Sequence, residues 1–169
     1  MIPIYIGTSE RFRAIEGMTE RSILANTNSK VDIKHIYPSH ESGCTGFSNV
    51  RFTISYGIYL DIDMIVLGDI AELWAYREEG KFVCMQDGST EVAVIDCKHD
   101  CKDKLHTHLL PMVRKIPDKW NIEDYKYFPD NPLPESMDLF HFTSLDHQPW
   151  LYEHPHSEAN ELYKKWIRA

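Results

Sequence analysis

Two aspartates, Asp61 and Asp63, interrupt an otherwise apolar stretch, IYLDIDMIVL, at residues 58–67. If this stretch is a β-strand, side chains alternate between its faces, so the two aspartates share one face and Ile62 lies on the other. A carboxylate removed from water needs a cation or strong hydrogen bonds. Mg²⁺ and Mn²⁺ prefer oxygen ligands such as carboxylates, and they are often coordinated by one or two carboxylates together with the oxygens of a substrate phosphate. The pattern therefore predicts a metal-diphosphate site, although a D-x-D at an exposed strand end with solvated acids is the alternative.

The residues after this stretch predict a capped helix. Asp69 precedes Glu72 by three positions, which is the spacing of a capping box, and Gly80 is suited to a helix exit. We expect the helix to run from Ile70 to about Glu79. Asp69 is therefore expected to be its N-cap and not a metal ligand.

Taken together, residues 59–74, YLDIDMIVLGDIAELW, resemble the glycosyltransferases of GT-A fold, in particular family 8 and its bacterial and viral relatives. Their hallmark is an apolar strand, a D-x-D, a second apolar stretch and a helix with an acidic cap. The resemblance implies an α/β fold in which helices flank a mixed, mainly parallel sheet. At 169 residues the chain is long enough to bury a core, so we expect one compact domain over residues 1–169.

Two blocks before the D-x-D support this resemblance. Residues 2–9, IPIYIGTS, look like the family's first strand, whose end carries the nucleoside, here Ile6, Gly7 and Thr8. Gly7 would allow a ligand to approach the backbone closely. Residues 45–52, TGFSNVRF, are similar to the segment in which a basic residue faces the donor phosphates. Arg51 is the candidate, because a guanidinium can bind a phosphate in a bidentate manner.

A third block lies near the C-terminus. His141-Phe142-Thr143 and Gln148-Pro149-Trp150 look like the family's histidine and Lys-Pro-Trp block, which would make His141 the third protein ligand to the metal. This chain departs from the pattern, because Gln148 replaces the lysine, the spacing is one residue longer and the intervening glycine is absent. Contact between Gln148 and the diphosphate is therefore an open question.

The resemblance implies transfer of a hexose from a nucleotide sugar, such as UDP-glucose or UDP-galactose, to a hydroxyl acceptor with retention of configuration. Asp61, Asp63 and His141 would hold Mn²⁺ or Mg²⁺, and Ile62 is counted among the donor-binding residues. Gln86 and Asp87, after a predicted strand at 81–85, are the nearest polar candidates for the donor sugar or acceptor. Asp87 is equally suited to a turn.

Two other classes of function stay open. A sugar nucleotidyltransferase also uses paired acids and a metal, but its first strand is usually followed by a Gly-rich basic loop, whereas residues 7–13 read GTSERFR. A protein that binds a sugar nucleotide or a partner without turnover is the other alternative. The glutamine at position 148, where the family has a lysine, and the short acceptor region are consistent with such a binding protein.

Alternation of strands and helices along the rest of the chain favours an α/β sandwich. Apolar patterns predict strands at 2–7, 31–36, 57–61, 81–85 and 92–96, helices at about 11–25 and 101–110, and a loop-rich, proline-rich stretch at 111–135. The basic and aromatic residues at 162–168 are typical of a packed terminal helix, and contact with an anionic membrane surface is the alternative.

The formal charge of −8 and the lack of a long Lys/Arg cluster argue against general nucleic-acid binding. No membrane-spanning segment or signal peptide is visible, so we expect a cytoplasmic protein with reduced cysteines. Cys97 and Cys101, with His106 and His108, offer ligands for zinc. Their spacing is unlike common zinc modules, and Cys97 also fits the core.

Overall fold

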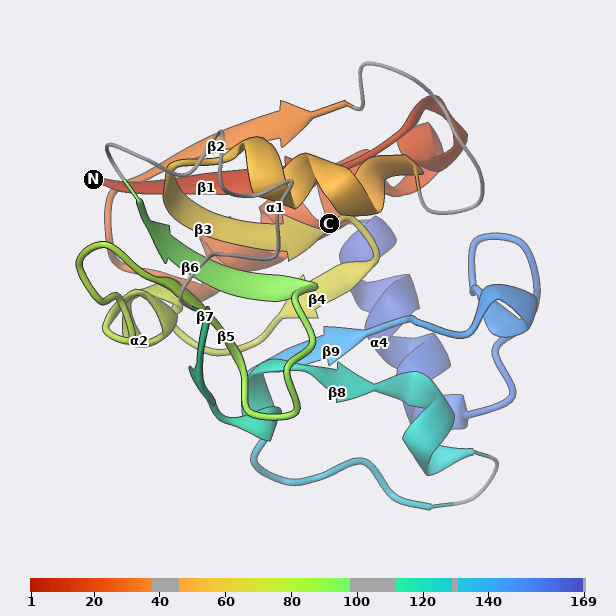
Figure 1. Cartoon of the computed structure of the whole chain (residues 1–169). Coiled ribbons are helices and arrows are strands. Elements are labelled where there is room, and N and C mark those ends of the chain that lie inside the picture. Colours follow the sequence, from red (N-terminus) through yellow and green to blue (C-terminus); the bar gives the residue numbers. More distant parts are fainter. Residues whose placement is uncertain (38–45, 98–111, 129–130, 169) are drawn as a thin grey trace.

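The computed structural model describes residues 1–37, 46–97, 112–128 and 131–168. In these ranges the strands form a six-stranded sheet, in the order β2-β1-β3-β6-β5-β7, and a three-stranded sheet, in the order β4-β9-β8 (Figure 1). The larger sheet contains β1 (Ile2–Gly7), β2 (Val31–Ile36), β3 (Tyr56–Asp61), β5 (Phe82–Met85), β6 (Val92–Asp96) and β7 (Met112–Ile116). The smaller one contains β4 (Met64–Val66), β8 (Ile122–Glu123) and β9 (Leu139–His141).

The larger sheet is mixed and mainly parallel, as the sequence predicts. β1 runs parallel to β2 and β3, and β5 runs parallel to β7, whereas β6 is antiparallel to both of its neighbours. Every residue of β5 and β6 is buried. Continuous burial of this kind explains why these strands read as unbroken apolar runs and not as alternating ones.

The helices are α1 (Glu16–Asn26), α2 (Ile70–Trp74) and α4 (Ser157–Ile167). The prediction of one helix from about residue 11 was wrong at its start, because a 3₁₀-helix, Glu10–Ile15, precedes α1. The Asp69 cap is confirmed, since its side chain accepts a hydrogen bond of 3.0 Å from Ala71 N.

α2 is shorter than the helix predicted to reach about Glu79. After Trp74, Tyr76 N donates to Leu73 O and Arg77 N donates to Trp74 O, which is the tighter spacing of a 3₁₀ turn. The Arg77 guanidinium then lies 4.8 Å from the Trp74 ring and 3.5 Å from Asp96 of the sheet. The regular α-helix therefore ends at Trp74, about five residues before the sequence pattern does.

The prediction of a loop-rich stretch at 111–135 was incomplete. It contains β7, β8 and two 3₁₀-helices, Asp118–Trp120 and Asp124–Tyr127. β8 is two residues long and pairs in parallel with β9, a partner about 18 residues away in sequence, so no local periodicity predicts it. The fully buried Trp120 anchors this segment in the core.

The C-terminal segment folds as the packed helix that the sequence favours. The Arg21 guanidinium on α1 donates to Trp166 O at 3.1 and 2.9 Å and to Ile167 O at 3.1 Å, and the Trp166 side chain is buried. Within the described ranges, none of the helices combines the length and the apolar character needed to cross a membrane.

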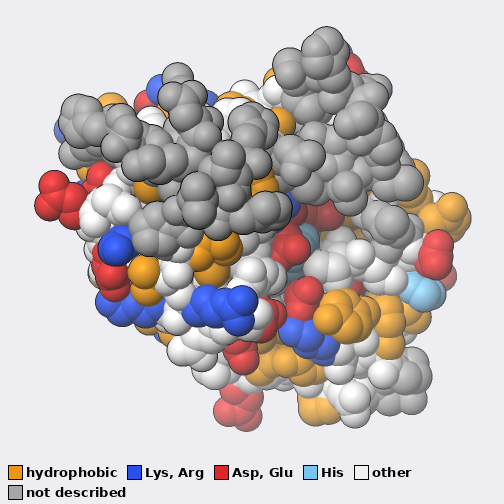
Figure 2. All heavy atoms as spheres, in the orientation of Figure 1, with side chains coloured by type: hydrophobic (Ala, Val, Ile, Leu, Met, Phe, Trp, Pro, Cys, Tyr) orange, Lys and Arg blue, Asp and Glu red, His pale blue; other side chains and the backbone are white. Residues whose placement is uncertain are grey.

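The described part of the visible surface carries Lys and Arg side chains dispersed among Asp and Glu (Figure 2). Of the residues considered for a zinc site, Cys101, His106 and His108 lie outside the described ranges. Cys97 is buried in a cluster with Ile54 and Tyr59, as expected for a core cysteine.

Candidate functional site

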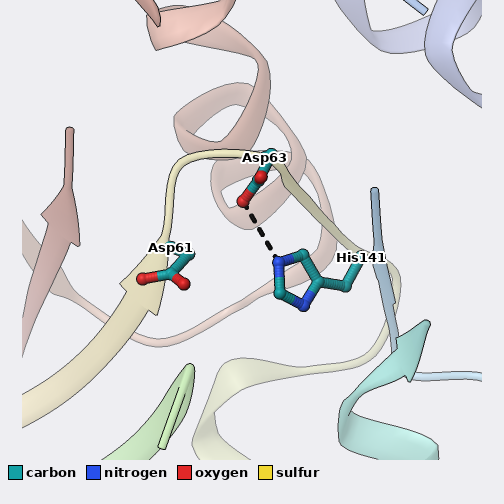
Figure 3. Close-up of side chains that lie close together, drawn as sticks. All are labelled: Asp61, Asp63 and His141. Atoms are coloured by element: carbon teal, nitrogen blue, oxygen red, sulfur yellow. Dashed lines mark hydrogen bonds and ion pairs between the residues drawn. The ribbon is translucent and has the colours of Figure 1, made fainter. Parts of the chain in front are cut away.

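The D-x-D motif lies at a bend and not within one continuous strand. β3 ends at Asp61, a turn contains Ile62 and Asp63, and β4 begins at Met64 and leads into the second sheet (Figure 3). The expected simple alternation along one strand was therefore wrong. Both carboxylates nevertheless converge, because the bend brings Asp63 back toward Asp61, and both are buried.

Polar side chains of α1 hold this bend in place. The hydroxyl oxygen of Thr19 lies 2.5 Å from Ile62 O and 2.7 Å from Met64 O, so the single proton of this buried hydroxyl is shared between the carbonyls on both sides of Asp63. Ser22 Oγ accepts a hydrogen bond from Val66 N, and Asn26 Nδ2 donates to Val66 O, both at 2.9 Å. The polar stripe of α1 therefore fixes the backbone that carries Asp63.

Removal of the Thr19 hydroxyl should loosen this bend. We expect Thr19→Val to lower the free energy of unfolding by about 1–3 kcal/mol, because two buried carbonyls lose their donor in a side chain of nearly unchanged shape. Thr19→Ser is the matched control, since it keeps the hydroxyl and should retain most of the stability. Urea unfolding of the three proteins measures the difference, and equal stability of Thr19→Val and wild type would contradict the assignment.

His141 reaches the two aspartates from the second sheet. β9 pairs antiparallel with β4 so that His141 lies opposite Met64, and Phe142 N donates to Asp63 O at 3.0 Å. The Nε2 atom of His141 lies 3.2 Å from Asp63 Oδ1 (Figure 3). Ligand atoms of Asp61, Asp63 and His141 all lie within 4.8 Å of one another.

Burial and mutual interaction shift the pKa values of the ionisable groups in this triad. Burial raises the pKa of Asp61 to about 6, against the opposing effect of Arg51. Burial alone would lower the pKa of His141, but the charge and hydrogen bond of Asp63, with a further contribution from Asp61, raise it to about 9. Two carboxylates that share a small buried volume are suited to a divalent cation, which would neutralise both.

Arg51 and Tyr59 make direct contacts with Asp61. Arg51 Nη2 lies 3.4 Å from both Asp61 oxygens, and Arg51 Nη1 donates to Thr90 Oγ1 at 2.9 Å. The Tyr59 hydroxyl donates to Asp61 Oδ1 at 2.5 Å, and the guanidinium of Arg51 lies 5.0 Å from the Tyr59 ring centroid. Arg51 is thus buried beside the predicted metal ligand, with its charge directed into the site.

The residues expected to bind the nucleoside lie next to the D-x-D. β1 and β3 are parallel, and their carboxyl ends are aligned so that Gly7 pairs with Asp61. Ligands of open α/β sheets commonly bind at such carboxyl ends. Ile6 and Thr8 are fully buried there.

Gly7 has a packing role that the sequence does not reveal. A Cβ at this position would lie 2.1 Å from the Tyr59 hydroxyl oxygen. The absent side chain therefore makes room for Tyr59, whose hydroxyl contacts Asp61.

Gln86 and Asp87 are both exposed in the turn between β5 and β6. Asp87 Oδ1 accepts a hydrogen bond of 2.8 Å from Ser89 N, and Gly88 takes φ +93°. Asp87 therefore has the turn geometry that the sequence left open for it. Its exposed side chain does not join the buried triad of Asp61, Asp63 and His141.

Gln148 is fully buried, and neither its amide oxygen nor its amide nitrogen has a hydrogen-bond partner among the described residues. Its backbone carbonyl accepts bonds from Leu151 N at 2.9 Å and Tyr152 N at 3.0 Å, which fixes the start of a turn. A buried amide without partners is costly in a folded protein. This side chain thus has hydrogen-bonding capacity that a polar ligand could use.

A buried acid that the sequence analysis missed holds the chain after His141. Asp124 Oδ1 accepts hydrogen bonds from Thr143 N at 3.1 Å, Thr143 Oγ1 at 2.9 Å and Ser144 N at 3.2 Å, and Oδ2 lies 3.1 Å from His154 Nε2. Burial works against ionisation, but the hydrogen bonds from His154 and Thr143 lower the pKa of Asp124. The network ties three separate segments together.

Two more residues near the triad carry no sequence motif. Asn121 Oδ1 lies 3.0 Å from His141 Nδ1. Glu91 directly precedes β6, and the pairing of β6 with β3 places Val92 opposite Leu60. The charge of Glu91 contributes to the raised pKa of His141. One Glu91 carboxylate oxygen is buried without a hydrogen-bond partner among the described residues. Only contacts between distant segments identify these two side chains.

Comparison with known proteins gives a consistent fold assignment. No family model matches the sequence, and no curated protein matches it either. Among solved structures, the apo glycosyltransferase GlyE of Streptococcus pneumoniae matches with a TM-score of 0.71 and 13% identity, over 99% of this chain and 60% of GlyE. The chain thus spans about three fifths of the length of GlyE.

Two further glycosyltransferases have similar structures. The galactosyltransferase LgtC, solved with donor and acceptor sugar analogues, matches with a TM-score of 0.64 and 10% identity, over 96% of this chain and 94% of LgtC. The bifunctional glycosyltransferase WbbM matches with a TM-score of 0.64 and 10% identity, over 98% of this chain and 52% of WbbM. With its mixed, mainly parallel sheet and flanking helices, the chain has the GT-A fold of these glycosyltransferases.

Proposed function

We propose that this protein is a metal-dependent glycosyltransferase that moves a hexose from a nucleotide sugar, UDP-glucose or UDP-galactose, to a hydroxyl acceptor with retention of configuration. The observation that carries the proposal is the buried triad of Asp61, Asp63 and His141 beside the carboxyl ends of β1 and β3. The GT-A fold and the solved complex of LgtC with sugar analogues support it.

The residues of the triad fit a divalent cation. Two buried carboxylates and an imidazole nitrogen converge within 4.8 Å, and burial, with a smaller contribution from the charge of Asp63, raises the pKa of Asp61. Asp61, Asp63 and His141 would hold Mn²⁺ or Mg²⁺. When bound, such an ion supplies Lewis-acid stabilisation of a departing nucleoside diphosphate.

The other residues of the site would bind and orient the donor. Arg51 would offer its guanidinium to the phosphates, because it lies buried beside Asp61. Ile6, Gly7 and Thr8 would contact the nucleoside part of the donor, at the carboxyl ends of β1 and β3. Ile62, between the two aspartates, is counted among the donor-binding residues. Gln86 and Asp87, exposed after β5, are the proposed contacts for the donor sugar or the acceptor.

The affinity for Mn²⁺ should rise with pH. His141 can bind a metal ion through Nε2 only after this atom has lost its proton, and the pKa of His141 in the metal-free protein is about 9. We therefore expect the affinity to increase about tenfold per pH unit between pH 7 and 9 and to level off above that. Calorimetry in two buffers of different ionisation enthalpy should detect release of about one proton, and a pH-independent affinity would contradict the role of His141.

Gln148→Lys tests whether the C-terminal block covers the diphosphate. If it does, the new ammonium should strengthen UDP binding about tenfold to a hundredfold, and uridine, which lacks phosphates, should bind as before. Gln148→Met, an uncharged side chain of similar length, is the matched control. Calorimetry should be used instead of turnover, because tighter UDP can slow product release. Unchanged UDP affinity in Gln148→Lys would place this residue away from the diphosphate.

One incubation separates the proposed function from its alternatives. The protein is mixed with UDP-glucose or UDP-galactose and Mn²⁺, with and without pyrophosphate. A transferase, or a slow hydrolase of the same design, releases UDP. A nucleotidyltransferase forms UTP only with pyrophosphate, and a binding protein leaves the donor intact; either of these results would overturn the proposal.

A further inference from the structure

Asn121 contacts one ring nitrogen of His141 and leaves the other ring nitrogen directed toward the aspartates of the site. Its Oδ1 lies 3.0 Å from His141 Nδ1, and Asn121 is buried, with 5% exposure. An amide oxygen can only accept a hydrogen bond, so this contact is a hydrogen bond when His141 Nδ1 carries a proton. The other ring nitrogen, Nε2, faces Asp63 Oδ1 at 3.2 Å.

The backbone around Asn121 gives this contact a fixed geometry. Asn121 N donates to Asp118 O at 2.8 Å, at the end of the 3₁₀-helix that contains the buried Trp120. β8 begins directly after Asn121 and pairs with β9, with Glu123 opposite His141. Asn121 therefore lies between the 3₁₀-helix and β8, one residue before the strand that pairs with the strand of His141.

We propose that Asn121 is a positioning residue for cation binding: it keeps a proton on His141 Nδ1, so that Nε2 is the nitrogen that gives up its proton to a cation and directs its lone pair toward Asp61 and Asp63. The proposal rests on the proposed function, because it assumes that His141 is a metal ligand. Partners of this kind fix the tautomer and the ring orientation of metal-binding histidines. No motif in the sequence marks Asn121 for this role.

A role in packing alone makes a different prediction. If Asn121 only filled space, a side chain of similar shape without an acceptor would leave the histidine unchanged. If it orients His141, loss of the acceptor should weaken cation binding about tenfold to a hundredfold, as is typical when such partners are removed. A carboxylate at the same position should preserve the effect, because it also accepts the Nδ1 proton.

The test uses Asn121→Leu, which removes the acceptor at similar volume, and Asn121→Asp, which keeps it. Asn160→Ala on α4 removes an asparagine side chain outside the His141 contact and serves as the control. Mn²⁺ affinity is measured by calorimetry without nucleotide, and the imidazole Nδ1–H of His141 is followed by ¹H–¹⁵N NMR in the metal-free protein. We expect weaker Mn²⁺ binding only in Asn121→Leu, with Asn121→Asp and Asn160→Ala at or above the wild-type affinity.

The NMR signal separates this proposal from the proposed function. In the wild type and in Asn121→Asp the Nδ1–H should be protected from exchange with water, and in Asn121→Leu this protection should be lost. Wild-type protein without a protected Nδ1–H, or Asn121→Leu with unchanged Mn²⁺ affinity, would overturn the role of Asn121. A protected Nδ1–H in a wild-type protein that does not bind Mn²⁺ would instead contradict the proposed function.

Discussion

Asp63→Asn is expected to reduce turnover at least about a hundredfold and Mn²⁺-dependent UDP affinity at least about tenfold, because one of two hard anionic ligands loses its charge. The fold should survive, since the amide keeps the shape of the side chain and an oxygen near His141. Turnover is measured as UDP release, affinity by calorimetry with and without Mn²⁺, and folding by thermal unfolding.

Asp69→Asn is the matched control for this variant. Asp69 belongs to the same sequence segment but caps α2 through Ala71 N, and asparagine is an equally good N-cap. The control should therefore retain both turnover and affinity. Wild-type donor affinity and turnover in Asp63→Asn would contradict the assignment of the D-x-D to the active site, independently of the result for Asp69→Asn.

Asp124→Ala is expected to cause the largest loss of stability of the changes considered, about 3–5 kcal/mol. The substitution leaves buried His154 without its carboxylate partner, and it removes the acceptor from Thr143 and from Ser144 N. Because Thr143 and Ser144 lie only two and three residues after His141, Mn²⁺ affinity should decline as well. Equilibrium unfolding in urea measures the stability.

Asp118→Ala controls for the removal of an acid from the same region. Asp118 is exposed, so its replacement should change the free energy of unfolding by no more than about 0.5 kcal/mol. A loss below about 1 kcal/mol in Asp124→Ala would mean that the buried network is not a major source of stability. The segment after His141 would then need another explanation for its position.

The sequence predicts those parts of the fold that depend on local patterns. Apolar runs identify β1, β2, β3, β5 and β6 to within about one residue, and the acidic cap identifies the start of α2. The fold class could also be predicted, because the D-x-D lies in a longer pattern of strand and capped helix. Such signals are contained in ten to twenty consecutive residues and need no knowledge of distant contacts.

The remaining parts depend on contacts between distant residues, which no local pattern encodes. Thr19 binds carbonyls 43 and 45 positions away, and Asn121 binds His141 across 20 positions. On α1, Thr19 and Ser22 resemble the polar residues of any exposed helix face, yet both are fully buried. The bend at Ile62 and Asp63 is hidden for the same reason, because α1 and β9 hold a segment that reads as one apolar strand.

Diffraction from crystals grown with Mn²⁺ and UDP tests the central claim most directly. Data collected near the manganese absorption edge locate the ion independently of the protein density. The proposed site predicts one strong anomalous peak in coordination contact with Asp61, Asp63 and His141, with the diphosphate of UDP on its open side. A peak at other residues, or UDP bound with no manganese at the triad, would contradict the account.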